Sequence, residues 1–101
     1  GLVGSEMCKE TATELAYAKD NATTLAGNFA VKEAVSKVFG TGFFGVEPYE
    51  IEVLRNESGA PYVKLYGNAK EIAKDKQVSR IHVSITNTRE FAQAFAIGEC
   101  V

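Results

Sequence analysis

Two charged residues in the stretch "AGNFAVKEAVSKVFGTG", Ala26 to Gly42, have types and spacing suited to phosphate chemistry. In a helix, residues four apart lie on the same face. One such stripe consists of Leu25, Phe29, Glu33 and Lys37. A carboxylate can bind Mg²⁺ together with phosphate oxygens, and a lysine one turn further on can reach the same phosphates. The spacing therefore permits two interpretations: a metal and phosphate site, or an ordinary exposed Glu33–Lys37 ion pair.

The other apolar residues of this segment predict that the helix is largely enclosed. They form a second stripe of Val31, Ala34, Val35 and Val38. Because both sides are apolar, we expect Glu33 to face inward, where an unpaired carboxylate is costly. A positive partner should therefore meet Glu33.

The predicted helix runs from Thr23 to Phe39 and is followed by the loop "GTGFFGVEP". Gly40 and Gly42 can take the positive backbone angles that a helix end and a tight loop require. A shorter helix is predicted before it, from Glu10 to Lys19, and "DNAT" between the two offers capping side chains. The charged segment Asn68 to Gln77 predicts an exposed helix capped by Asn68.

Two hairpins are predicted from alternating polar and apolar residues. The first joins Tyr49–Leu54 to Ala60–Gly67 through "RNESG". The second joins "SRIHVSIT" to "EFAQAFAIG" through "NTR". In "SRIHVSIT", one face carries Ile81, Val83 and Ile85, and the other carries His82, Ser84 and Thr86. This order of elements predicts an α+β fold with a mainly antiparallel sheet packed around a long central helix.

Length and composition favour one soluble domain over residues 1–101. Hydrophobic residues make up 46% of the chain and charged residues 24%, which is the balance of a globular protein. The net charge of −2 favours neither nucleic acid nor a membrane surface as a partner. We find no apolar run of about 20 residues and no signal peptide, so a cytoplasmic location is expected, with Cys8 and Cys100 as free thiols.

Three segments together closely resemble holo-acyl-carrier-protein synthase, the small type of 4'-phosphopantetheinyl transferase. They are "LAGNFAVKEAVSKVFGTGF", "IEVLRNESGAPYVKLYGNAKEIA" and "IHVSITNTREFAQAFAI". The resemblance covers about Glu14 to Glu99. It implies transfer of phosphopantetheine from coenzyme A to a serine of an acyl carrier protein, with Mg²⁺ as cofactor and 3',5'-ADP as the other product.

The resemblance also implies roles for individual residues. Glu33 matches the metal-binding carboxylate, and Lys37 matches a lysine that contacts the pyrophosphate. The loop of Gly40, Thr41 and Gly42 matches a glycine-rich segment near the nucleotide. His82 matches a histidine at the coenzyme A site, with Ser84 on the same strand face. A homotrimer with active sites between subunits is implied as well, and the edges left by so short a sheet favour assembly.

The chain departs from the family in three places. Family members begin with a strand bearing a G-x-D motif, whose aspartate is a second metal carboxylate, followed by a long basic helix that meets the carrier protein. Here only nine residues precede Glu10, and "VGSE" offers Glu6 as a substitute carboxylate. The opening residues permit two interpretations, a short strand or a remnant foreign to the natural chain.

Asn28 stands where the family usually has arginine, and Asn87 stands where it often has a second histidine. An asparagine does not replace a guanidinium as a bidentate phosphate donor. Three functions therefore stay open: a transferase, a truncated or impaired domain that keeps the fold and nucleotide pocket, and a binding or assembly module without chemistry.

Overall fold

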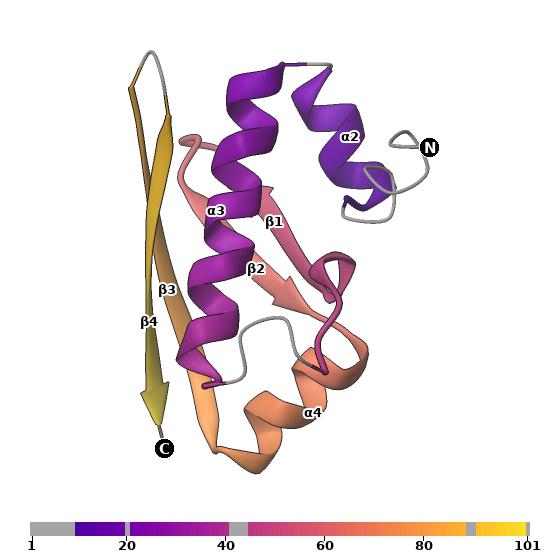
Figure 1. Cartoon of the computed structure of the whole chain (residues 1–101), viewed down its shortest axis with the longest axis vertical. Coiled ribbons are helices and arrows are strands. Elements are labelled where there is room, and N and C mark those ends of the chain that lie inside the picture. The colour runs from indigo at the N-terminus through magenta and orange to yellow at the C-terminus, as the bar shows by residue number, and fades with distance from the viewer. Residues whose placement is uncertain (1–9, 20, 41–44, 89–90, 101) are drawn as a thin grey trace.

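The computed structural model describes residues 10–19, 21–40, 45–88 and 91–100. Figure 1 shows the elements in their order along the chain. Their bounds are α2 Ala12–Ala18, α3 Ala22–Val38, the 3₁₀ helix η1 Pro48–Glu50, β1 Ile51–Arg55, β2 Pro61–Leu65, α4 Gly67–Asp75, β3 Val78–Asn87 and β4 Ala92–Cys100. The predicted α+β class and the predicted order of helices and strands are confirmed.

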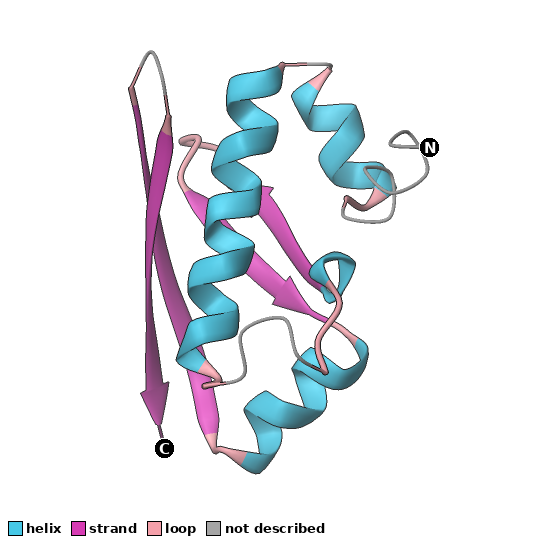
Figure 2. Cartoon of the chain, viewed as in Figure 1, coloured by secondary structure: helices cyan, strands magenta, loops and turns pink. Residues whose placement is uncertain are grey.

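The strands form two separate antiparallel hairpins, coloured magenta in Figure 2, and not one continuous sheet. In the first hairpin Val53 of β1 lies opposite Val63 of β2. In the second, Ile85 of β3 lies opposite Ala94 of β4. β2 lies beside β3, but no ladder of hydrogen bonds joins the two hairpins.

Helix α3 packs along β3 and β4 and also contacts β1 and α2 (Figure 1). Its exposed positions include Ala26, Glu33 and Lys37, so one flank of the helix is not enclosed. The prediction that a long helix lies at the centre of the fold stays a prediction.

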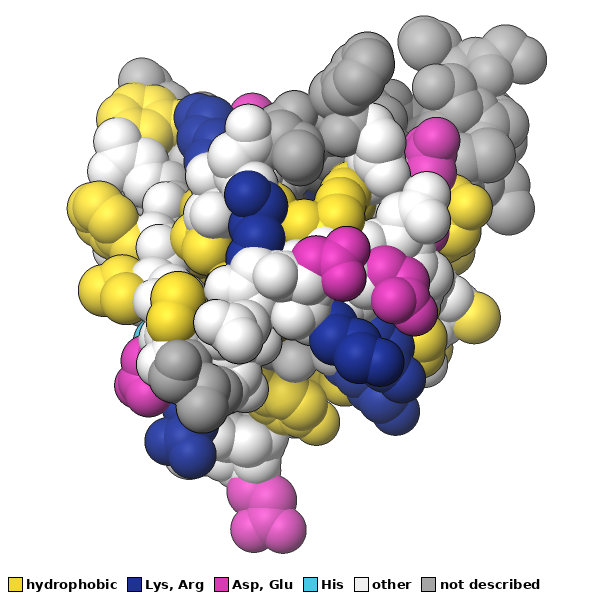
Figure 3. Space-filling model, turned by 90° about the horizontal axis from the view of Figure 1, so that it is seen from below, with side chains coloured by type: hydrophobic (Ala, Val, Ile, Leu, Met, Phe, Trp, Pro, Cys, Tyr) yellow, Lys and Arg dark blue, Asp and Glu magenta, His cyan; other side chains and the backbone are white. Residues whose placement is uncertain are grey.

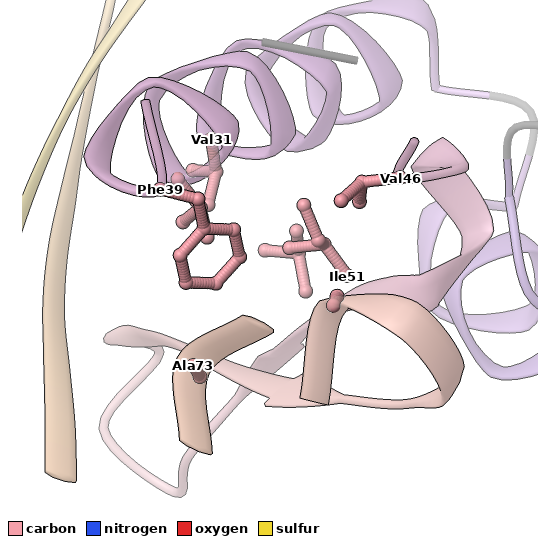
Figure 4. Packing of buried hydrophobic residues seen from close by; sticks show 8 residues of the cluster. Val31, Phe39, Val46, Ile51 and Ala73 are labelled. Atoms are coloured by element: carbon pink, nitrogen blue, oxygen red, sulfur yellow. The ribbon is translucent and has the colours of Figure 1, made fainter. Parts of the chain in front are cut away.

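The hydrophobic core lies between α3, β1 and α4. Figure 4 shows Val31 and Phe39 of the α3 segment close to Val46 and Ile51, with Ala73 of α4 on the opposite side. All of these side chains except Ala73 are at most 1% exposed. Burying each large apolar side chain of such a core contributes about 1.5–3 kcal/mol.

Side-chain caps begin the first two helices, and the cap of the second lies in the predicted segment "DNAT". Thr11 forms a capping box with Glu14 at α2, and Asn21 accepts the N–H of Thr24 at α3. The predicted cap of α4 is wrong, because Asn68 is the second residue of that helix. Its backbone N–H instead donates to Glu50 Oε2 at 2.9 Å, so the cap comes from η1.

A buried ion pair joins α2, α3 and β1. Lys32 Nζ lies 2.9 Å from Glu14 Oε2, and neither side chain is exposed to solvent. Lys32 also donates to the carbonyl oxygen of Ile51, while Glu14 accepts the N–H of Val53. These two backbone groups lie on the edge of β1 away from β2, so the ion pair satisfies an edge that would otherwise be open.

Among the residues that the structure describes, none of the helices is both long and apolar enough to span a membrane.

Candidate functional site

Glu33 and Lys37 lie on the exposed flank of α3, one helical turn apart. The prediction that Glu33 faces inward is wrong, because its side chain is exposed. The residue enclosed at this level of the helix is its neighbour Lys32. The buried face follows Val31, Val35 and Phe39, and this face places position 33 outside the core.

A groove runs between this flank of α3 and strand β4. It has a volume of about 450 Å³. From α3 it is lined by Ala30, Glu33, Ala34 and Lys37, and from β4 by Ala92, Gln93, Ala94 and Phe95. Small alanine side chains on both walls keep the groove open, and its two charged residues are the pair that the sequence selected. The exposed ion pair that their spacing permits is absent from the described part of the structure.

The groove therefore offers a carboxylate and an ammonium group, both exposed and neither paired with a described residue. A carboxylate can hold a divalent cation, and an ammonium group can hold phosphate oxygens. Within the described ranges, however, no group of three or more His, Cys, Asp or Glu residues could hold a metal by itself. Among the described residues, Glu33 is thus the one carboxylate of the groove that could bind a metal. Glu6 lies outside the described residues.

Gly40 follows Phe39, the C-cap of α3, and has the predicted positive φ, at 79°. Its N–H donates to the carbonyl oxygen of Lys37 at 2.9 Å, so it ends the helix that carries the charged pair. Thr41 and Gly42, the other predicted residues of this loop, lie outside the described residues.

His82 and Ser84 lie on the face of β3 that points away from α3. The predicted alternation is confirmed, because Ile81, Val83 and Ile85 are half-buried and pack on the core while His82 and Ser84 are exposed. His82 Nε2 pairs with Glu99 of β4. The structure therefore does not bring His82 and Ser84 into the groove of Glu33 and Lys37.

The same outer face of the hairpin carries large exposed apolar side chains. Phe95 is 69% exposed and Ile97 is 66% exposed. They lie opposite Ser84 and His82 in the register of the hairpin. In the view of Figure 3, hydrophobic side chains project along the left side of the molecule, where β3 and β4 run.

Asn28 is buried and does not face the groove. Its Oδ1 accepts a hydrogen bond of 2.9 Å from Arg55 Nη2, and it is 1% exposed. The Arg55 guanidinium also lies over the ring of Tyr17, 5.5 Å from its centroid. Asn28 thus holds an arginine of β1 in place, and the second guanidinium nitrogen, Nη1, is buried without an acceptor among the described residues.

Sequence reasoning missed Lys32 and Glu14 altogether. Burial lowers the pKa of the Lys32 ammonium, and the neighbouring Glu14 carboxylate opposes that shift. The spacing of polar residues in α3 does indicate that Lys32 is buried. Lys32 is four residues from both Asn28 and Ser36, and the three form a buried row on the helix. This row lies beside the buried Val31 and Val35.

A family model of the 4'-phosphopantetheinyl transferase superfamily matches residues 5–98. The chain is 63% identical over 76 residues to the holo-[acyl-carrier-protein] synthase of Lachnoclostridium phytofermentans, an alignment that covers 75% of this chain and 62% of the relative. It is 45% identical over 92 residues to the holo-[acyl-carrier-protein] synthase of Halothermothrix orenii, covering 88% of this chain and 74% of the relative.

Among solved structures, the fold is similar to that of Helicobacter pylori holo-[acyl-carrier-protein] synthase in complex with coenzyme A. The TM-score is 0.86 at 24% identity, and the alignment covers 96% of this chain and 83% of the other. At this identity the likeness concerns the fold alone. The chain spans somewhat less than two thirds of the length of the Lachnoclostridium relative.

Proposed function

Because the chain belongs to the 4'-phosphopantetheinyl transferase superfamily, we propose that it transfers phosphopantetheine from coenzyme A to a serine of an apo acyl carrier protein. The observation that carries the proposal is the groove in which Glu33 and Lys37 lie one helical turn apart, where no described residue forms an ion pair with either side chain. The two relatives named holo-[acyl-carrier-protein] synthase support the choice of substrates. We treat residues 1–101 as one such domain and place it in the cytoplasm.

In this reaction the serine oxygen attacks the phosphorus atom that bears pantetheine, and the proton of the serine hydroxyl passes to solvent. The bond from that phosphorus to the bridging pyrophosphate oxygen breaks, and 3',5'-ADP leaves with the electron pair. Little covalent chemistry is required of the protein, so positioning and charge stabilisation carry most of the catalysis. Lys37 would hold the pyrophosphate and stabilise the negative charge that develops on the leaving group.

The residues of the groove fit Mg²⁺, which accepts one or two carboxylates together with phosphate oxygens and water. Glu33 would supply a carboxylate, and Glu6 is our candidate for a second. When bound, the ion neutralises charge on the phosphates. Because Glu33 is the one carboxylate of the groove among the described residues, most other ligands would come from the substrate and water.

A homotrimer with shared sites accounts for the position of His82 and Ser84. Within one chain they lie on the outer face of the β3–β4 hairpin, whereas Glu33 and Lys37 lie beside its other face. A single coenzyme A molecule could contact both pairs if the outer face of one copy covers the groove of another. The exposed Phe95 and Ile97 on that outer face favour such a contact.

A second candidate function is a domain that binds the nucleotide but transfers its arm poorly. The single described carboxylate of the groove favours it, because one carboxylate holds Mg²⁺ more weakly than two. The buried Asn28 adds no phosphate donor to the groove.

The test is incubation of the purified chain with Mg²⁺, coenzyme A and an apo acyl carrier protein, followed by intact mass measurement. We expect the carrier protein to gain the mass of phosphopantetheine. Glu33→Gln should reduce transfer without unfolding the chain, while Glu71→Gln on the exposed side of α4 serves as the control. Unmodified carrier protein, together with binding of coenzyme A, would support the second candidate.

A further inference from the structure

The wall of the groove formed by β4 is the edge of the strand itself. Successive residues of a strand point to opposite faces, yet all four residues from Ala92 to Phe95 line the groove. Ala92 and Ala94 point toward α3, and Gln93 and Phe95 point away from it. Both sets can line one groove only if the groove reaches the backbone between them.

The turn of the hairpin identifies the backbone groups on this edge. The N–H of Thr88 donates to the carbonyl of Phe91 at 2.8 Å, and the register continues from Asn87 opposite Ala92 to Ser84 opposite Phe95. In antiparallel pairs, hydrogen-bonded and non-bonded positions alternate. The N–H and C=O groups of Gln93 and Phe95 therefore face β3, whereas those of Ala92, Ala94 and Ala96 face outward.

Within the described part of the chain, β4 pairs with β3 alone. The groove thus has an unpaired row of amide donors and acceptors on one wall, and Glu33 and Lys37 on the other. An unpaired strand edge is a template for any extended chain that contains amides. The volume of the groove, about 450 Å³, lies within the range of small-molecule sites.

We propose that the outer edge of β4 at Ala92 and Ala94 binds the pantetheine arm of coenzyme A by strand-like hydrogen bonds. This inference rests on the proposed function. The arm is an extended chain with two amide groups, and it begins at the pyrophosphate that Lys37 would hold. The alanines of both walls leave room for its methylene groups.

Only one amide of the arm is expected to pair well. The two amides are joined through β-alanine, which has one more methylene group than an α-amino acid. Their spacing therefore differs from the spacing of outward groups along a strand, where like groups recur every second residue at about 6.6–6.8 Å. We assign the pairing to Ala94, whose outward N–H and C=O lie within the stretch that lines the groove.

The direct test is amide hydrogen exchange of the whole chain, measured by NMR with no ligand, with 3',5'-ADP and with coenzyme A. 3',5'-ADP lacks the arm. We expect coenzyme A to slow exchange at Ala94 by about tenfold, with no such effect from 3',5'-ADP. Equal protection by both ligands, or protection by neither, would overturn the inference. Protection of Ala94 that is as strong without ligand as with coenzyme A would also overturn it, because the edge would then be closed to the arm.

Two proline variants provide a matched pair for binding measurements. Proline is tolerated where the N–H faces away from the ladder, so both Ala94→Pro and Ala96→Pro remove an outward donor from β4. Only Ala94 lies in the groove. Ala94→Pro should raise the Kd for coenzyme A by about tenfold and leave the Kd for 3',5'-ADP unchanged, while Ala96→Pro should change neither.

The outcomes separate this inference from the proposed function. If the wild-type chain binds 3',5'-ADP and coenzyme A with equal affinity, the arm site is refuted. The nucleotide site of the proposed function is then unaffected. Failure of both ligands to bind would refute both proposals. An equal loss of affinity in the two proline variants would assign the effect to the strand as a whole and also refute the arm site.

Discussion

Lys32 and Glu33 are neighbours in the chain, yet the fold places them in opposite environments. Lys32 is fully buried with Glu14, whereas Glu33 is exposed in the groove. A residue on a helix advances by about 100° from the one before it, so adjacent residues can belong to the core and to the surface. One residue of this motif is therefore part of the core, and the next is available at the surface for the ligand binding that we propose.

Removing the Lys32 ammonium should destabilise the fold strongly. Lys32→Met leaves the Glu14 carboxylate buried without its cation, and we expect a loss of about 3–5 kcal/mol in the free energy of unfolding. Urea denaturation followed by circular dichroism measures this loss. Lys37→Met, at an exposed position on the same helix, should change stability by no more than about 0.5 kcal/mol. A loss at Lys32 as small as that at Lys37 would contradict a structural role for the ion pair.

Tyr66 should titrate above the usual range of a tyrosine. Its hydroxyl donates a 2.9 Å hydrogen bond to Glu52 Oε1, and this bond raises the pKa of Tyr66. Because the folded pKa lies above the unfolded one, the stability from this bond is fully present below the unfolded pKa. It is lost as the pH rises through the folded pKa.

Absorbance of tyrosinate against pH measures the titration of Tyr66. We expect Tyr66→Phe to remove a component that titrates above the usual range of tyrosine, and Glu52→Gln to shift that component to lower pH. If the titration curve of Tyr66→Phe still contains that component, its assignment to Tyr66 is wrong.

At the scale of elements, most helices and strands follow from local patterns, but one cap does not. The alternation in "SRIHVSIT" predicts both faces of β3, and Asn21 is a local cap for α3. The cap of α4 comes from Glu50, eighteen residues before Asn68. Such a contact depends on how η1 and α4 pack, so no local pattern around Asn68 could predict it. The burial of Lys32 likewise depends on the position of α2.

Loss of the Glu50 carboxylate should loosen α4. Glu50 accepts the N–H groups of both Glu47 and Asn68, and Glu50→Ala leaves these donors without that acceptor. We expect a loss of about 1.5–3 kcal/mol, with faster hydrogen exchange in the first turn of α4. Glu71→Ala, on the exposed side of the same helix, is the control and should have little effect. Equal exchange rates in the two variants would refute capping by Glu50.

At the scale of the molecule, the residues selected from the sequence fall on two surfaces that one chain does not bring together. Glu33 and Lys37 line the groove, while His82 and Ser84 lie on the outer face of the β3–β4 hairpin. Periodicity predicts the exposed face of His82 and Ser84, but it places Glu33 inward, on the wrong side of α3. It could not predict that the two sets are separated, because that depends on which side of the hairpin α3 covers.

Mixing two inactive variants tests whether one site joins these surfaces from different copies. Glu33→Gln damages the groove, and His82→Ala damages the outer face, so each should reduce transfer to an apo carrier protein when it is alone. After the two are unfolded and refolded together, roughly a quarter of the interfaces would combine an intact groove with an intact outer face. We expect part of the activity to return in this mixture. The double variant Glu33→Gln with His82→Ala, refolded with either single variant, contributes no intact pair and should restore nothing. If mixing the single variants gives no more activity than their average, each site is contained in one chain and the shared-site arrangement is wrong.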